Sequence, residues 1–123
     1  MNTSYSSRLF HSPPELLCRI HSLLFKLGIG LQYKGFWLCA YAIYLSVTDP
    51  IRLSRITKNV YAEVAEYFHI SLYSVERNIR TVIEIAWQHD PEGLAAISGR
   101  KVLFKPTASE FISMITFHLI VKS

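Results

Sequence analysis

Glu76, Arg77 and Arg80 are the residues of this sequence whose chemistry is most informative. They lie in the segment YAEVAEYFHISLYSVERNIR, where Val75 and Ile79 have the spacing of the buried face of a helix. The two arginines and the glutamate then lie on the opposite arc of that helix, facing solvent. In the DNA major groove, arginine can make a bidentate contact with guanine, and glutamate can accept from cytosine. The three side chains are therefore candidates for DNA base contact. For Arg77 and Arg80 the alternatives are phosphate contact and plain solvation, and for Glu76 the alternative is a helix-terminal charge favoured by the dipole.

The residues before this face have the pattern of a helix-turn-helix. Ala65 is small where the two helices would touch, and the apolar Phe68 and Ile70 flank the predicted turn. Ser71 can cap the second helix by accepting from a free N–H group of its first turn. The pattern predicts a DNA-binding helix-turn-helix, and a solvated helix hairpin in an all-α protein is the alternative.

A second group of side chains is placed to contact the DNA backbone. Ser71, Tyr73 and Ser74 open the predicted recognition helix, and the opening turn of such a helix meets phosphates. For Ser71, capping alone is the alternative. Lys105 fits a phosphate or a neighbouring protomer, with an exposed loop charge as the alternative.

Helix start and stop signals divide the chain into an all-α fold. Capping boxes are predicted at Ser12 with Glu15 and at Thr107 with Glu110, and Gly28 and Gly99 end two helices. Asp49-Pro50 opens a short helix or turn through Arg55, and Asp90-Pro91 opens a further short helix. Arg100 to Pro106 is expected to be a loop, with extended backbone at Lys101 to Phe104 as an alternative. We expect a compact single domain of about six helices with these boundaries: a flexible tail at 1–11, the helical DNA-binding domain at 12–123, the helix-turn-helix at about 58–88 and the recognition helix at about 71–88.

Composition is consistent with this reading without proving it. The 123 residues suffice for one domain, and the net charge of +4 with a pI near 9.2 is compatible with a polyanionic partner. Hydrophobic residues make up 50% and aromatic residues 13%, which indicates a surface kept for a partner. The large aromatic side chains Trp87, Phe111 and Phe117 are expected in the core.

Metal, membrane and catalytic functions are not indicated. Cys18 and Cys39 have the pattern of buried, reduced thiols, and Cys18-x-x-His21 has no second ligand pair, so we expect no metal and no cofactor. The apolar run from Phe36 to Val47 is too short to span a bilayer and is expected to be a core helix, so membrane association is not expected. No secretory signal or nucleophile–base arrangement appears, which predicts a cytoplasmic protein that is not an enzyme.

Four segments resemble one known family. The chain resembles the C-terminal DNA-binding domain of the sporulation-initiation response regulator of endospore-forming bacteria, from near Leu17 to its end. The segments are LGIGLQYKGF (27–36), SRITKNVYAEVAEYF (54–68), SVERNIRTVIEIAW (74–87) and KPTASEFISM (105–114). The resemblance implies a six-helix domain that binds short asymmetric boxes of double-stranded DNA, often as head-to-tail pairs. It also implies that Lys58, in the ITK segment, contacts phosphate.

The sequence departs from the family pattern at several positions. Ser74 and Thr81 stand where arginine and histidine are usual, Glu66-Tyr67 replaces lysines, and His69 takes a turn position where glycine is common. The scaffold and the VER-x-IR residues remain, so we expect weaker phosphate affinity and an altered preferred box.

Eleven polar residues before the first predicted helix cannot form the receiver domain that the family's regulator carries. The leading hypothesis is thus a sequence-specific transcription regulator that binds double-stranded DNA without its own sensor. The alternative is a receiverless protein-interaction module that pairs with a full-length regulator and titrates it. For the head-to-tail homodimer on DNA, we expect contact through the last two helices, around Phe111 to Leu119.

Overall fold

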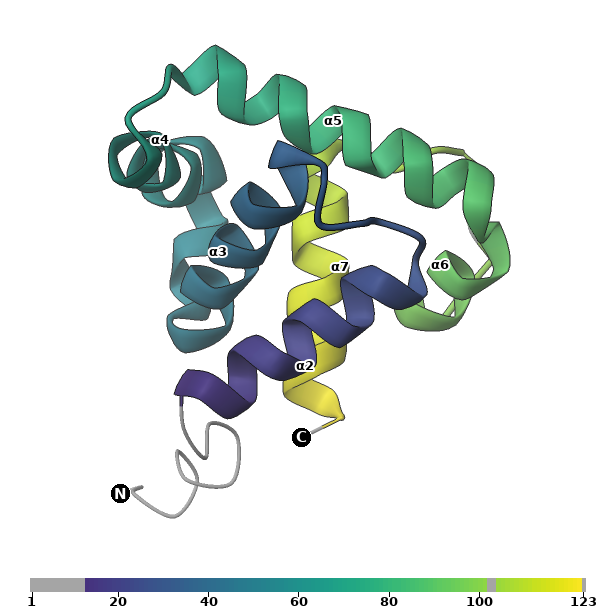
Figure 1. Cartoon of the computed structure of the whole chain (residues 1–123). Helices are drawn as coiled ribbons and strands as arrows, with labels where there is room; N and C mark the ends of the chain where they lie inside the picture. Colours follow the sequence, from purple (N-terminus) through teal and green to yellow (C-terminus); the bar gives the residue numbers. More distant parts are fainter. Residues whose placement is uncertain (1–12, 102–103, 123) are drawn as a thin grey trace, which may run out of the picture.

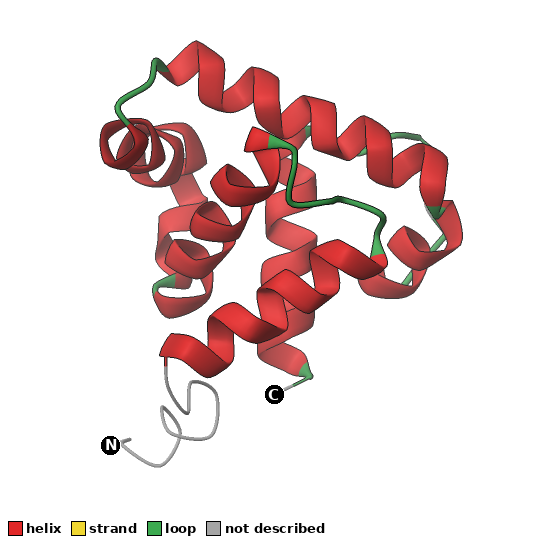
Figure 2. Cartoon of the chain, viewed as in Figure 1, coloured by secondary structure: helices red, strands yellow, loops and turns green. Residues whose placement is uncertain are grey.

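The computed structural model describes residues 13–101 and 104–122 (Figure 1). Within these residues the chain forms six α-helices, two shorter helical segments and no strand (Figure 2), which confirms the predicted all-α fold. In chain order the elements are α2 (Pro13–Lys26), α3 (Lys34–Thr48), the 3-10 helix η1 (Pro50–Arg55), the π-helical turn η2 (Thr57–Tyr61), α4 (Ala62–Phe68), α5 (Leu72–His89), α6 (Pro91–Ser98) and α7 (Ala108–Val121).

Helix α3 is the centre of the fold, as expected for the apolar run from Phe36 to Val47. Its sequence is apolar almost all the way around, and such a helix is stable only when neighbours cover every side. It packs against α2, α5 and α7; in Figure 1, α5 crosses the top of the α3–α7 pair and α2 crosses the lower half. The hydroxyl of the buried Ser46 donates to the Ala42 carbonyl at 2.8 Å, so this polar group in the core is satisfied.

Local capping chemistry sets the helix ends, as predicted. The Asp90 carboxylate accepts from the Gly93 N–H at 2.9 Å and starts α6. Thr107 and Glu110 form the reciprocal capping box of α7. Gly28 follows α2 with φ +89°, and a Cβ there would lie 2.4 Å from the His89 ring, so only glycine allows these two helix ends to meet.

Two burial predictions were wrong, for the same geometric reason. Cys18 was expected in the core but is exposed, whereas Cys39 is buried, and both are free thiols. Phe117 was also expected in the core but is 55% exposed. Each lies two residues from buried neighbours on its own helix, and a two-residue step of about 200° places a side chain on the opposite face.

Some sequence predictions lie outside the described residues. These are the tail at 1–11, the Ser12 half of the first capping box, and the middle of the 101–104 segment. None of the described helices is long and apolar enough to cross a membrane.

Candidate nucleic-acid interface

Helices α4 and α5 form the predicted helix-turn-helix. Ala65 is buried on α4 where that helix packs against α5. His69 ends α4 in the left-handed conformation, with φ 58° and ψ 47°, and the Ile70 N–H donates back to the Ala65 carbonyl at 3.0 Å. Histidine thus takes the conformation that glycine adopts at lowest cost at a helix end.

The face of α5 opposite the core presents the predicted base-contact residues. Val75 and Ile79 are fully buried, while Arg77 and Arg80 are exposed and Glu76 is half-buried. Neither arginine takes part in an ion pair within the described part of the chain. Arg77 and Arg80 are thus exposed as expected from helical periodicity, Glu76 is only partly exposed, and the contact of all three with bases stays a prediction.

The first turn of α5 is organised by side-chain hydrogen bonds. The Ser71 hydroxyl accepts from the Ser74 N–H at 3.0 Å, so the predicted cap is present. The Asn78 amide donates to the Ser74 carbonyl at 2.8 Å and to its hydroxyl at 3.3 Å. Each serine hydroxyl keeps its own hydrogen as a donor, so neither bond prevents a phosphate contact. The role of Asn78 was not visible in the sequence, because an amide side chain on a helix can also simply face solvent.

A hollow lies beside this face, between α5 and the start of α7. Its lining includes Glu76 and Arg80 from α5, Lys105 and Thr107 from the preceding loop, and Tyr61 from η2. Burial, with smaller contributions from Cys39 and Glu76, raises the pKa of the Tyr61 hydroxyl well above its ordinary value. The structure thus brings Lys105 close to the residues predicted to contact bases.

Lys105 is not a free charge. Its ammonium group forms an ion pair with the Glu84 carboxylate on the outer side of α5, and Gln88 donates to the same carboxylate at 2.7 Å. The Lys105 hydrogen bond, followed by that from Gln88, holds the pKa of Glu84 below its ordinary value. A phosphate contact from Lys105 would therefore have to compete with Glu84.

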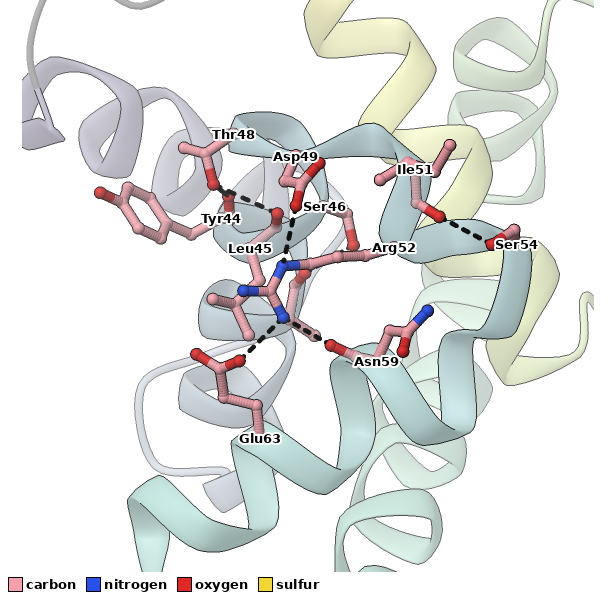
Figure 3. A network of polar contacts seen from close by, with 11 residues as sticks. Tyr44, Leu45, Ser46, Thr48, Asp49, Ile51, Arg52, Ser54, Asn59 and Glu63 are labelled. Carbon is pink, nitrogen blue, oxygen red and sulfur yellow. Dashed lines mark hydrogen bonds and ion pairs between the residues drawn. The ribbon is translucent and has the colours of Figure 1, made fainter.

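Arg52 differs from Lys58 although both belong to the basic run before the motif. Figure 3 shows the Arg52 guanidinium enclosed by η1, η2 and α4, where it donates to the Asn59 carbonyl at 2.6 Å and pairs with Glu63 at 2.8 Å. Asp49 lies 3.8 Å from its Nε atom. Lys58 is exposed on η2 and has no ion pair among the described residues. Arg52 therefore links η1 to η2 and α4, whereas the charge of Lys58 remains available for a DNA phosphate.

The helix-turn-helix and its flank are nearly neutral in charge. Residues 49–84 together with Lys105 carry six cationic side chains and five carboxylates. The cations are Arg52, Arg55, Lys58, Arg77, Arg80 and Lys105, and the carboxylates are Asp49, Glu63, Glu66, Glu76 and Glu84. Because Arg52 and Lys105 are already paired, the remaining basic character comes from four residues, two of them on α5.

An all-α fold with a turn between α4 and α5, whose second helix presents arginines to solvent, is typical of helix-turn-helix DNA-binding domains. The model of the family described as sporulation initiation factor Spo0A C terminal matches residues 20–119, so the chain belongs to this family. The resemblance seen in the sequence is thereby confirmed, and with it a DNA-binding domain of a sporulation regulator as the general class.

Proposed function

We propose that the chain binds double-stranded DNA sequence-specifically, with α5 in the major groove and Glu76, Arg77 and Arg80 at base edges. The observation that carries this proposal is the pair of arginines on the outer face of α5. They are exposed, three residues apart and without an ion pair among the described residues, on the side of α5 away from the buried Val75 and Ile79. An unpaired arginine keeps all five donors of its planar group available, as bidentate contact with guanine requires.

The backbone contacts in this proposal come from residues around that face. Ser71, Tyr73 and Ser74 lie at the N-terminal end of α5, where the helix dipole favours a negative group. Lys58 of η2 and Lys105 of the loop before α7 would add two ionic contacts with phosphates. These contacts would set the register of the domain on the duplex and carry no sequence information themselves.

The test compares two duplexes at fixed salt. A preferred box is first selected from a random duplex pool, and binding to it and to a scrambled duplex is followed by fluorescence anisotropy. Arg77→Ala or Arg80→Ala should cost about 1–3 kcal/mol on the selected box and much less on the scrambled one. Arg100→Ala, which removes an exposed arginine away from α5, is the matched control. Equal losses on both duplexes would reduce Arg77 and Arg80 to phosphate contacts.

The domain is further proposed to act as head-to-tail pairs on adjacent boxes. A nearly neutral motif makes few ionic phosphate contacts, so one protomer alone should bind weakly and a second should add affinity through proximity. We expect the contact between protomers around Phe111 to Leu119. Within this range, the side chains of Phe111, Ile112, Ile115 and Leu119 are buried in the chain's own core and cannot reach a neighbour. Phe117 and Val121, at 55% and 76% exposure, are the apolar side chains of α7 left for a neighbour.

Cooperative binding is measured on one-box and two-box duplexes of varied spacing. Affinity that depends on spacing by half a helical turn is expected for a tandem pair that must lie on one side of the duplex. Phe117→Ser should lower this cooperativity and leave one-box binding unchanged. The same affinity per box at every spacing would exclude tandem action.

A second candidate function is the protein-interaction module that titrates a full-length regulator. One observation favours it: Phe104 and Phe117 line a second hollow, distinct from the one that Glu76 and Arg80 line, and Phe104 is 82% exposed. A tight dimer in solution without DNA, seen by sedimentation equilibrium, together with equal affinity for the selected and scrambled duplexes, would replace the first proposal with this one.

A further inference from the structure

Tyr73 is an exposed aromatic residue at the start of the proposed recognition helix. It is 67% exposed, and within the described residues its ring stacks on no other aromatic ring. Its contact is with a cation: the guanidinium carbon of Arg77, one turn further along α5, lies 5.9 Å from the centre of the Tyr73 ring. This distance lies within the limit of about 6 Å for a cation–π interaction.

The charges around Arg77 favour this position of its side chain. Arg80 lies three residues on, and like charges at that helical spacing repel each other. Ser74 and Thr81, three residues before and four after Arg77, carry no charge. Arg77 is therefore held between a repelling arginine on one side and the electron-rich face of Tyr73 on the other.

Arg80 has a different neighbour at the same spacing. Glu76 lies four residues before it and both line the hollow between α5 and the start of α7, although no ion pair joins the two within the described residues. Arg77 thus lies over the Tyr73 ring near the beginning of α5, whereas Arg80 lines the hollow. Without the Tyr73 ring, the long flexible side chain of Arg77 would lose more rotamer freedom on contacting a base.

We propose that Tyr73 is a positioning residue, whose ring directs the Arg77 guanidinium toward the bases while its hydroxyl remains available for a backbone phosphate. This inference rests on the proposed function, because it takes Arg77 to be a base contact. It assigns two separable roles to one side chain: the ring should affect discrimination between sequences, and the hydroxyl should affect affinity for all sequences.

Substitutions at Tyr73 separate these roles. Tyr73→Phe keeps the ring, so the ratio of selected-box to scrambled-duplex affinity should stay unchanged while both affinities fall. Tyr73→Leu removes the ring as well, and the ratio should fall by about two- to fivefold, the range for an exposed cation–π contact. Tyr67→Leu, which removes an exposed tyrosine on α4, is the matched control and should leave the ratio unchanged.

A double-mutant cycle tests the coupling to Arg77 directly. In the Arg77→Ala background, Tyr73→Leu should produce no further loss in the ratio. In the free protein, the NMR signals of the Arg77 side-chain protons should show a ring-current shift that Tyr73→Phe retains and Tyr73→Leu abolishes.

The failures of the inference and of the proposed function can be told apart. If Arg77→Ala lowers the ratio but Tyr73→Leu does not, or if their effects add, Tyr73 does not position Arg77 and the inference is overturned. If Arg77→Ala leaves the ratio unchanged, Arg77 is not a base contact, and the proposed function fails at that residue together with the inference.

Discussion

At the scale of single residues, the two lysines expected on the DNA backbone have different surroundings. Lys58 stands exposed on η2, whereas Lys105 is bound to Glu84. A surface ion pair of this kind contributes little to stability, because solvent screens both charges. It nevertheless matters for binding, because Lys105 must give up its ion pair with Glu84 before it can neutralise a phosphate.

Lys58→Ala should weaken binding to every duplex and make the dependence of log K on log salt shallower by about one unit. Lys105→Ala should change that slope less, since Glu84 competes for its ammonium group. Titrations at several salt concentrations measure both slopes.

Glu84→Gln provides the complementary control, because it frees Lys105 and should strengthen binding to selected and scrambled duplexes alike. Adding Lys105→Ala should remove the gain. If Glu84→Gln changes nothing while Lys58→Ala also leaves the slope intact, both lysines lie off the DNA path.

At the scale of elements, the turn between α4 and α5 includes a backbone conformation that lowers the free energy of unfolding. His69 is the one non-glycine residue with positive φ in the described chain. A residue with a Cβ in this region costs about 1–2 kcal/mol. The turn survives because both flanking helices are anchored, α4 by Val64 and Ala65 and α5 by its Ser71 cap.

His69→Gly should raise the free energy of unfolding by up to about 1 kcal/mol, because the strain it removes exceeds the unfolded-state entropy that glycine adds, about 0.4–1 kcal/mol. Urea denaturation followed by circular dichroism measures the change. His69→Ala keeps the Cβ and should give no gain. Destabilisation by His69→Gly would show that the histidine side chain makes a stabilising contact that outweighs the strain.

At the scale of the whole molecule, α3 sets the position of α5. Gly35 near the start of α3 is buried, and a Cβ there would lie 2.4 Å from the Asn78 carbonyl oxygen and 2.6 Å from the Val82 side chain. The backbone of α3 therefore touches α5 directly beneath the residues of the outer face. Any change that separates these helices should also displace Arg77 and Arg80.

On helix propensity alone, Gly35→Ala would stabilise the chain by up to about 1 kcal/mol. The contact with backbone reverses the sign, and we expect a loss of about 1–3 kcal/mol from overpacking, with weaker binding to the selected box. Gly30→Ala is the matched control, since its new Cβ would meet only the flexible side chain of Gln32. Unchanged stability of Gly35→Ala would mean that the cost of overpacking does not exceed the gain in helix propensity, so that α3 and α5 adjust to the added Cβ with little loss.

The sequence by itself determined the features that depend on a few neighbouring residues. The caps at Ser71, Asp90 and Thr107 follow from hydrogen bonds within one helical turn, and the faces of α5 follow from helical periodicity. The motif was visible for the same reason, because its small residue, turn and cap lie within a short stretch of chain. The positive φ of His69 could be anticipated from its place at a turn between two helical patterns.

Only the tertiary structure decided which of several chemically similar side chains form ion pairs or pack in the core, and which stay exposed. Arg52 and Lys58 look alike in the sequence, but Arg52 meets Asn59 and Glu63 across a fold-back of the chain. Lys105, in the loop before α7, pairs with Glu84 of α5, and Phe117 turns outward although its helix is apolar on most sides. These outcomes depend on where distant elements pack, and composition and periodicity along one helix carry no information about the partner that another helix supplies.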